Sequence, residues 1–493
     1  MSDRLRPRDL SLLALETASS PMHNATVEVF DPGDSGFDYA RLVHLVGDRI
    51  AFVPRYRQRL VTVPGRLANP VWVDDPDFDL AYHVRRSALP RPGTHDQLRE
   101  LVERIVSRPL DRNRPLWEVY FVEGLEHGRV ALLSKSHQVL VDGMHTVDLG
   151  QVLLDAAPEP KTLEHDEWHP RGRPTPGGLL AGAVADTVHR PLTAVSTVRA
   201  NTDAALRTAG GAVQRLRETA GALAGRRPEH ETPVNRPLSQ QRRFVTVDTR
   251  LADYRRVRRV HGGTVNDVIL ATVTGALRSW LMTRAESLGG IRKLRAIVPM
   301  SVIDEELEET SLGSQVAGHL VDLPVGEASP VVRLHQVSYS FRAHRETSRA
   351  VSANRLAGIA GFAPTTFHAL GSRLAAGHLR TGFNLSVTNV PGPQFPLYAA
   401  GARMLETYPV HPLLPHHALA IGVTSYDEHV FYGITADRDA LPDVDVLAAC
   451  VREALDELLD TVSGGRTQAP RGRRAPARGK SAPGGTRKKA APR

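Results

Sequence analysis

Two polar, proline-rich stretches, residues 158–176 and 228–242, interrupt this chain of 493 residues. On either side of them, short apolar runs alternate with segments whose apolar residues recur at helical spacing, a pattern typical of α/β proteins. The length is large for one core and suits two domains. We therefore expect residues 1–157 and residues 243–462 to fold as two α/β units.

The first unit holds clear strand and helix patterns. Alternating apolar residues predict a strand at residues 25–30, which an Asp-Pro-Gly turn ends. Apolar residues at helical spacing predict helices over residues 39–50 and 97–106. Residues 116–122 and 130–133 are expected to pair as a hairpin through a glycine-containing turn.

The second unit repeats this mixture of patterns. Its expected strands are residues 244–247, 296–300, 383–387, 418–424 and 429–435, and its expected helices are residues 265–282 and 444–462. The last two strands are predicted to form a hairpin.

Residues 158–242 connect the two units. Within them, residues 179–223 are rich in Ala, Arg, Thr and Val and predict one or two helices with a weak apolar face, which Pro191 would break or kink. A long crossover connection packed on the surface is the favoured interpretation, and a helix lying on a membrane surface is the alternative.

The net charge of +8 is concentrated at the C-terminal end of the chain. Residues 463–493 contain ten Lys and Arg and no Asp or Glu, so subtracting these ten from +8 leaves about −2 for residues 1–462. This tail is of low complexity, and we expect it to be disordered. A solvated basic tail is the favoured interpretation, with contact to anionic lipid or nucleic acid as the alternatives.

The sequence also bears on the cellular compartment. The single cysteine, Cys450, excludes a disulfide within the chain and fits a reducing compartment, and its apolar surroundings predict a small core residue on a helix. No signal sequence and no run of about 18 apolar residues occurs. We expect a cytoplasmic protein, with peripheral contact to a membrane or lipid inclusion as a further expectation.

The sharpest cluster of polar residues follows a predicted strand and precedes a predicted helix. It contains His137, Gln138, Asp142 and Gly143, and the glycine permits a tight backbone turn. Polar residues at the end of a strand are well placed for an active site. Taken alone, however, one His near one Asp is more often a structural hydrogen-bonded pair.

This cluster resembles the HHxxxDG motif of the wax ester synthase/diacylglycerol acyltransferase family, which condensation domains and chloramphenicol-acetyltransferase-like enzymes share. The resemblance covers nearly all of residues 8–460. It includes residues 72–84, residues 108–118 with the PLW motif, residues 263–271 with the ND motif, and residues 298–301, 388–393 and 435–439. Several motifs in the same order are far more specific than any one of them.

The resemblance implies two chloramphenicol-acetyltransferase-like lobes, each a mixed sheet flanked by helices, with a substrate tunnel between them. It implies an O-acyltransferase that moves a fatty acyl group from acyl-CoA to diacylglycerol in triacylglycerol synthesis. Long-chain alcohols, which would yield wax esters, are the second acceptor class. Acyl-CoA is then a substrate, and we expect no further cofactor, no metal and no specific nucleic acid.

The reaction requires a base at this motif. A neutral hydroxyl is a poor nucleophile towards a thioester, and a histidine with an unperturbed pKa of about 6.5 suits the removal of its proton. In the family the second His of the motif is that base, and the Asp shapes the loop. Here the position holds Gln138, whose amide cannot be protonated at neutral pH.

Another histidine would then have to replace the missing base. His137 would point to the opposite face of an extended strand. His145, His416 and His417 are the remaining candidates, although each is more often a structural residue.

The resemblance implies further candidate substrate-binding residues. They are Asn266, Asp267, Asn389, Pro115, Leu116 and Trp117. The Asn-Asp pair would line the tunnel or simply start a helix. The PLW motif has packing as its more frequent role, and a rigid turn at residues 390–393 would position the asparagine that precedes it.

Three hypotheses for the function remain open. The first is the acyltransferase just described. The second is a catalytically weak or inactive paralogue that binds acyl-CoA or lipid at a membrane or lipid droplet, which the glutamine at the base position favours. The third is a condensation-type acyltransferase with an acceptor other than a glyceride.

Overall fold

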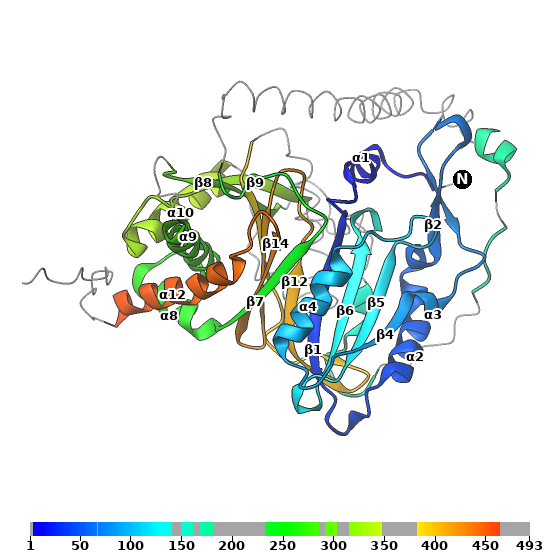
Figure 1. Ribbon diagram of the computed structural model, residues 1–493, viewed down its shortest axis with the longest axis horizontal. Coiled ribbons are helices and arrows are strands. Elements are labelled where there is room, and N and C mark those ends of the chain that lie inside the picture. Colours follow the sequence, from blue (N-terminus) through cyan, green and yellow to red (C-terminus); the bar gives the residue numbers. More distant parts are fainter. Residues whose placement is uncertain are drawn as a thin grey trace, which may run out of the picture.

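The computed structural model describes residues 3–66, 68–140, 149–160, 168–172, 174–181, 232–284, 291–302, 315–347 and 382–463. Within these ranges the strands form two mixed six-stranded sheets and one two-stranded sheet. Figure 1 shows the two large sheets in neighbouring lobes, each with helices beside it. The predicted α/β class with two lobes is confirmed, whereas the substrate tunnel between them stays a prediction.

The first lobe contains most elements of the N-terminal half. Its helices are α1 (Pro7–Leu15), α2 (Tyr39–Arg49), α3 (Leu80–His83), α4 (His95–Val106) and α5 (Leu149–Leu153). Its large sheet has the order β11-β12-β1-β6-β5-β4, made from β1 (His23–Asp31), β4 (Val84–Ala88), β5 (Trp117–Glu123), β6 (Val130–His137), β11 (Tyr398–Ala399) and β12 (Ala402–Val410). The small sheet pairs β2 (Gln58–Val61) with β3 (Val71–Asp74). The strand predicted at residues 25–30, both predicted helices and the hairpin of β5 with β6 are confirmed.

Helix α4 is specified by its own sequence. Thr94 and Gln97 form a reciprocal capping box that satisfies free N–H groups at the start of the helix. Leu98, Val102 and Ile105 then recur at helical spacing and are buried against the first sheet. The end of α4 is thereby held beside the end of β6.

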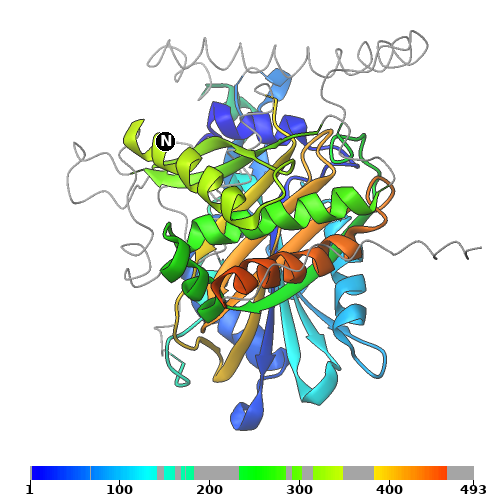
Figure 2. The ribbon, with the colours of Figure 1, turned by 90° about the vertical axis from the view of Figure 1, so that its left-hand side faces the viewer.

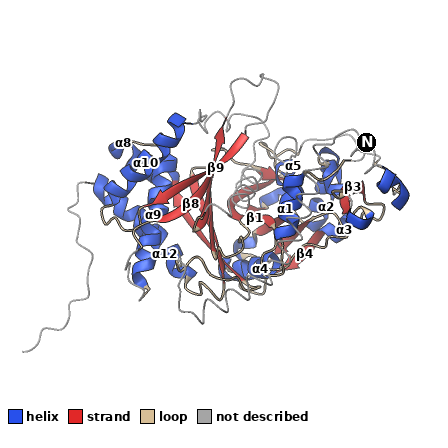
Figure 3. Cartoon of the chain, turned by 90° about the horizontal axis from the view of Figure 1, so that it is seen from above, coloured by secondary structure: helices blue, strands red, loops and turns tan. Residues whose placement is uncertain are grey.

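The second lobe has one sheet with helices on one side. The sheet order is β7-β14-β13-β10-β8-β9, made from β7 (Arg242–Arg250), β8 (Leu294–Val302), β9 (Gln315–Leu323), β10 (Leu385–Pro391), β13 (Leu419–Tyr426) and β14 (His429–Asp437). The helices α8 (Leu251–His261), α9 (Val265–Thr283), α10 (Pro330–Thr347) and α12 (Val444–Val462) lie across one face of this sheet (Figure 2). Seen from above, they cover the side that faces away from the first lobe (Figure 3). The predicted hairpin of β13 with β14 and both predicted helices are confirmed.

A segment of the C-terminal half of the chain joins the sheet of the first lobe, which the positions of the linkers did not indicate. The sequence assigns residues 243–462 to one continuous unit, yet β11 and β12 from this range hydrogen-bond in the first sheet. Strand β12 pairs antiparallel with β1, from Ala25 opposite Val410 to Asp31 opposite Arg403. The boundary of the predicted C-terminal lobe therefore needs this correction.

Two glycines let β12 cross close to the second sheet. Gly422 and Gly433 are opposite each other on β13 and β14. A Cβ atom on Gly433 would lie 1.9 Å from the carbonyl oxygen of Pro409, and one on Gly422 would lie 2.6 Å from Nε2 of His411. Because neither distance is sterically allowed, only glycine permits this junction between the lobes.

Some predictions fall on residues that the structure does not describe. Most of the predicted crossover helices, at residues 182–231, and the basic tail beyond Ser463 lie outside the described ranges. Cys450 is buried on α12, as predicted. Among the helices of the described ranges, none is long and apolar enough to cross a membrane.

Candidate active site at the end of strand β6

Strand β6 delivers His137 and Gln138 to a point where the chain turns into the short 3-10 helix η6 (Gln138–Leu140). The backbone N–H of His137 donates to Leu116 O at 2.9 Å, and that of Gln138 donates to Met22 O at 3.0 Å. Main-chain bonds to both neighbouring strand ends therefore fix the two residues. Both are fully buried.

The contacts of the His137 ring determine its tautomer. The backbone N–H of Val139 donates to Nδ1 at 3.1 Å, so this nitrogen carries a lone pair. In the neutral ring the proton then resides on Nε2, which lies 3.6 Å from Oε1 of Glu16. Since one nitrogen already accepts a hydrogen bond and the other carries the proton, His137 is not available as the base.

The carboxylate of Glu16 is buried between His137 and the half-exposed side chain of Arg112. Its carboxylate accepts a hydrogen bond from Nε of Arg112 at 2.8 Å while its other oxygen faces His137. Burial alone would raise the pKa of Glu16, but the contacts with His137 and Arg112 outweigh burial and lower this pKa to about 2. An ionised carboxylate therefore faces Nε2 of the imidazole, at an ion-pair distance rather than in a hydrogen bond.

Gln138 is in the opposite situation. Its side chain is fully buried, yet neither its amide oxygen nor its amide nitrogen has a hydrogen-bond partner among the described residues. Leaving such a group unpaired costs about 1–3 kcal/mol. The hydrogen-bonding capacity of this amide is therefore unused within the described part of the chain.

Two basic side chains beside His137 hold the end of α4. Nζ of Lys135 donates to Ile105 O at 3.1 Å and to Arg108 O at 2.6 Å, and Nε2 of His23 contacts Val106 O at 3.0 Å. Such side chains satisfy the carbonyl groups that a helix leaves free at its C-terminus. Burial lowers the pKa of Lys135 to about 8, and burial together with Lys135 keeps the pKa of His23 well below its usual value.

The remaining residues of the catalytic motif are not placed. Asp142 and Gly143 lie within residues 141–148, outside the described ranges, as does His145. Their predicted roles stay predictions.

The PLW motif forms part of the first lobe's core. Pro115, Leu116 and Trp117 are buried. The indole of Trp117 donates to Tyr56 O at 2.7 Å, and its ring stacks on His83 with 4.6 Å between ring centres. These contacts agree with the packing interpretation, while contact with substrate stays a prediction.

The two asparagines predicted to bind substrate meet across the second lobe. Nδ2 of Asn389, on β10, donates to Oδ1 of Asn266 at the start of α9, at 2.7 Å. Asp267 instead caps α9, because it accepts the backbone N–H of Thr264 at 2.9 Å in a reciprocal capping box. The ND motif thus combines a helix start with an asparagine that joins α9 to β10.

The two histidines considered as alternative bases differ in exposure. His416 is exposed, whereas His417 is buried and stacks on Phe383. The ring nitrogens of His417 lie 2.8 Å from Pro415 O and 3.1 Å from Phe383 O, and burial lowers its pKa. These contacts give His417 a structural role in the second lobe.

Glu16 and Arg112 are site residues that the sequence did not single out. Arg112 lies inside the motif at residues 108–118, so its position carried a signal, but a lone glutamate just after α1 did not. A further buried histidine that the sequence did not single out is His411, whose Nε2 lies 2.5 Å from Oγ1 of Thr388 on β10 and whose pKa burial lowers to about 3.

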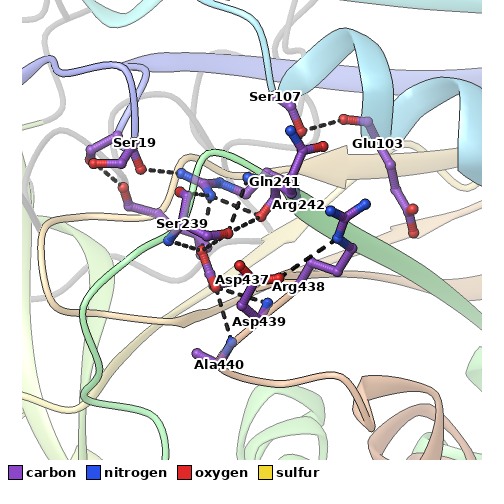
Figure 4. A network of polar contacts seen from close by, with 12 residues as sticks. Ser19, Glu103, Ser107, Ser239, Gln241, Arg242, Asp437, Arg438, Asp439 and Ala440 are labelled. Carbon is purple, nitrogen blue, oxygen red and sulfur yellow. Dashed lines mark hydrogen bonds and ion pairs between the residues drawn. The ribbon is translucent and has the colours of Figure 1, made fainter.

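A buried ion pair ties the segment after Glu16 to the second lobe (Figure 4). Arg242 bonds Asp437 at 3.2 Å and also donates to Ser19 O. The carboxylate of Asp437 further accepts hydrogen bonds from the backbone N–H groups of Asp439 and Ala440 at 3.1 and 3.0 Å. Burial lowers the pKa of Arg242. Both lobes therefore hold the chain that presents Glu16 to His137.

Comparison with known families assigns both halves of the chain. The description "Wax ester synthase/diacylglycerol acyltransferase catalytic domain" matches residues 5–269, which include the end of β6. The chain belongs to the wax ester synthase/diacylglycerol acyltransferase family. The description "WS/DGAT C-terminal domain" matches residues 312–459. The resemblance inferred from the ordered motifs is confirmed.

Two curated relatives align with more than half of this chain. It is 32% identical to the probable diacylglycerol O-acyltransferase tgs1 of Mycobacterium tuberculosis over 423 residues, 86% of this chain and 88% of the relative. It is 39% identical to the probable diacylglycerol O-acyltransferase tgs3 of the same organism over 260 residues, 52% of this chain and 96% of the relative.

Solved structures agree with the two-lobe fold. A wax ester synthase/diacylglycerol acyltransferase from Marinobacter aquaeolei superposes with a TM-score of 0.64 at 27% identity, covering 93% of this chain and 100% of the other. The first condensation domain of the calcium-dependent antibiotic synthetase superposes with a TM-score of 0.53 at 14% identity, covering 95% and 99%. The second likeness concerns the fold alone.

Proposed function

We propose that this chain transfers a fatty acyl group from acyl-CoA to the free hydroxyl of diacylglycerol, with long-chain alcohols as a second class of acceptor. The match of the family's catalytic domain over residues 5–269 carries this proposal, because it places the end of β6 within that domain. In the reaction an ester C–O bond forms, the thioester C–S bond breaks, and the hydroxyl proton ends on the CoA thiolate. Triacylglycerol and CoA are the products.

The residues of β6 support this reaction through position and polarity. His137 contacts Glu16 and accepts a hydrogen bond from the Val139 N–H, which fixes the turn after β6. The main-chain hydrogen bond of Gln138 to Met22 O fixes the backbone that carries the amide. The amide oxygen of Gln138 accepts a hydrogen bond from the acceptor hydroxyl and orients it towards the thioester carbon. Holding two reactants in line is worth several orders of magnitude in rate even without a protonatable base.

A weakly active or inactive paralogue that binds acyl-CoA or lipid is the second candidate function. It rests on Gln138, which stands where the family's HHxxxDG motif has its base and cannot take a proton at neutral pH. Positioning would then remain while proton removal, worth about 10²–10⁴ in rate, would be lost.

We further propose that the protein works in the cytoplasm and contacts anionic membranes or lipid inclusions peripherally. The ten Lys and Arg residues between 464 and 493 support this contact, since each such charge contributes about 1 kcal/mol near an anionic surface. The hydrophobic acceptor resides in membranes and lipid inclusions, so contact with them would bring the enzyme to its substrate.

An acceptor panel tests the function directly. Purified protein receives oleoyl-CoA with dioleoylglycerol, with hexadecanol or with no acceptor, and both CoA release and ester formation are measured. The acyltransferase predicts ester and CoA in equal amounts with dioleoylglycerol. Binding of oleoyl-CoA without ester from any acceptor would favour the paralogue, and CoA release without acceptor would indicate a thioesterase.

A further inference from the structure

Among the residues that the structure describes, three polar side chains on β1, on β6 and directly after β6 are enclosed by protein and have no hydrogen-bond partner. They are Asn24, Ser134 and Gln138. Both amide atoms of Asn24, both amide atoms of Gln138 and the hydroxyl of Ser134 are unpaired. Buried polar groups in folded proteins almost always have partners, so three unpaired groups on two adjacent strands call for a physical explanation.

The strand register places these three groups on one face of the first sheet. Asn24 is directly opposite Ser136 in the antiparallel pair of β1 with β6. Ser134 lies two residues before Ser136 and is a diagonal neighbour of Asn24. Gln138 follows His137, the last paired residue of β6, and begins the short helix η6. Diagonal neighbours on one face are about 7–8 Å apart. The ladder bond from Gln138 N–H to Met22 O keeps this alternation up to the glutamine.

Gln138, Asn24 and Ser134 therefore form a row along one face of the sheet. The row starts at Gln138, the proposed position of the reaction, and runs away from it. Gln138 occupies the place where the acceptor hydroxyl is activated, and Asn24 and then Ser134 follow. His137, by contrast, points to the other face with Glu16 and Lys135. The polar groups of an acceptor bound at Gln138 would meet the row in this order.

We infer that Gln138, Asn24 and Ser134 bind the polar end of the acceptor and select diacylglycerol over a long-chain alcohol. This inference rests on the proposed function and specifies its acceptor. Two and three glycerol carbons separate the free hydroxyl oxygen of a 1,2-diacylglycerol from its two ester oxygens. The hydroxyl bonds the amide of Gln138, and the ester oxygens accept hydrogen bonds from the amide of Asn24 and the hydroxyl of Ser134.

A long-chain alcohol satisfies only the first member of the row. Its methylene chain would lie against the side chains of Asn24 and Ser134 and exclude water from them. A site built to hydrogen-bond a substrate discriminates strongly against an analogue that lacks the matching group, because its buried polar groups are left unpaired. The row thus favours the glyceride by penalising the alcohol.

The test compares two acceptors within each variant. The ratio of kcat/KM for dioleoylglycerol to kcat/KM for hexadecanol, with oleoyl-CoA as donor, is measured for the wild type, Asn24→Leu and Ser134→Ala. This ratio does not depend on the fraction of folded enzyme, so a partial folding defect does not disturb it. The expected result is a ratio above one for the wild type and a fall of about 10-fold in each variant.

Ser338→Ala is the matched control. Its hydroxyl is also buried and unpaired, but it lies on α10 in the second lobe. The control is expected to keep the wild-type ratio. An unchanged ratio in both test variants, or an equal fall in the control, would overturn the inference. A higher KM for oleoyl-CoA with both acceptors alike would also overturn it, because the row would then bind the amides of the pantetheine arm.

A binding measurement separates failure of this inference from failure of the proposed function. Dioctanoylglycerol is added to each variant, and the melting temperature is recorded without acyl-CoA. The row predicts stabilisation of the wild type and of Ser338→Ala but not of Asn24→Leu. If the protein shows this pattern of stabilisation but forms no ester, the proposed catalysis is wrong and the inference that the row binds a glyceride stands. Equal stabilisation of all variants would contradict that inference.

Discussion

At the end of β6, the adjacent side chains of His137 and Gln138 differ in their hydrogen bonding. His137 has one ring nitrogen bonded to the Val139 N–H and the other facing Glu16, so it is held in place and not reactive. Gln138 is equally buried, but its amide is unpaired. The sequence predicted that the two would differ, because adjacent residues of a strand point to opposite faces. It could not predict Glu16, since the contact with His137 joins residues far apart in the chain.

Glu16→Gln tests the buried charge beside His137. Because the pKa of Glu16 is lowered from 4.5 to about 2 in the folded protein, its stabilising contribution is complete above the ordinary value of 4.5. The contribution is lost as the pH falls towards about 2. The wild type should exceed the variant by roughly 3 kcal/mol in unfolding free energy at pH 7, and the difference should shrink below pH 4.5.

The control for this experiment is Glu123→Gln, which breaks the partly exposed ion pair with Arg86. Surface pairs contribute little, so this variant should be nearly as stable as the wild type at pH 7. Denaturant unfolding at several pH values provides the measurement. A difference between wild type and Glu16→Gln that does not change between pH 7 and pH 3 would show that the carboxylate is not stabilised by the fold.

Elements formed by local patterns were predictable, and an element formed by a distant pairing was not. Helices α2, α4, α9 and α12 follow from their own apolar spacing, and the predicted ranges match closely. Strand β12 instead owes its place to β1, which is nearly the whole chain away. Its sequence also contains Pro409, a residue that usually argues against a strand. No local pattern could therefore assign it to the first sheet.

Gly433→Ala tests the close crossing of β12 over the second sheet. The added methyl group would lie 1.9 Å from Pro409 O, so the strands must separate. Overpacking of this kind costs about 1–3 kcal/mol or more. Urea unfolding should show this loss.

The matched control is Gly47→Ala on the exposed side of α2, where the nearest atom is Leu80 Cδ2 at 3.6 Å. It should be neutral or stabilising by up to about 1 kcal/mol, because alanine favours a helix over glycine. Equal effects of the two substitutions would mean that the lobes are not held at this distance.

At the scale of the whole molecule, the two lobes are joined by β12 and by hydrogen bonds of Arg242 to both lobes. Strand β12 crosses from one half into the other sheet, and Arg242 bonds both Asp437 and Ser19 O. The predicted division at residues 158–242 did not indicate this exchange. Linkers are visible in composition, whereas contacts between lobes depend on tertiary packing.

Deleting residues 464–493 tests the contribution of the basic tail. The tail carries ten positive charges and no negative ones and shows no apolar periodicity. The melting temperature and the rate with detergent-dispersed substrate should therefore be unchanged. Binding to vesicles that contain anionic lipid should weaken, and its dependence on salt should decrease.

A variant with the tail's Lys and Arg replaced by Gln should behave like the deletion and serves as its control. Unchanged vesicle binding in both variants would assign membrane contact to another part of the molecule. A large fall in melting temperature for the deletion alone would indicate that the tail is part of the fold.

We propose that acyl transfer takes place at the end of β6, where Gln138 stands in the position of the base. The most direct measurement is the rate of triacylglycerol formation from oleoyl-CoA and dioleoylglycerol by wild type and Gln138→His at equal thermal stability. A histidine there restores proton removal, so the rate should rise by a factor within about 10²–10⁴ and follow the histidine's titration. An unchanged or lower rate would contradict the claim.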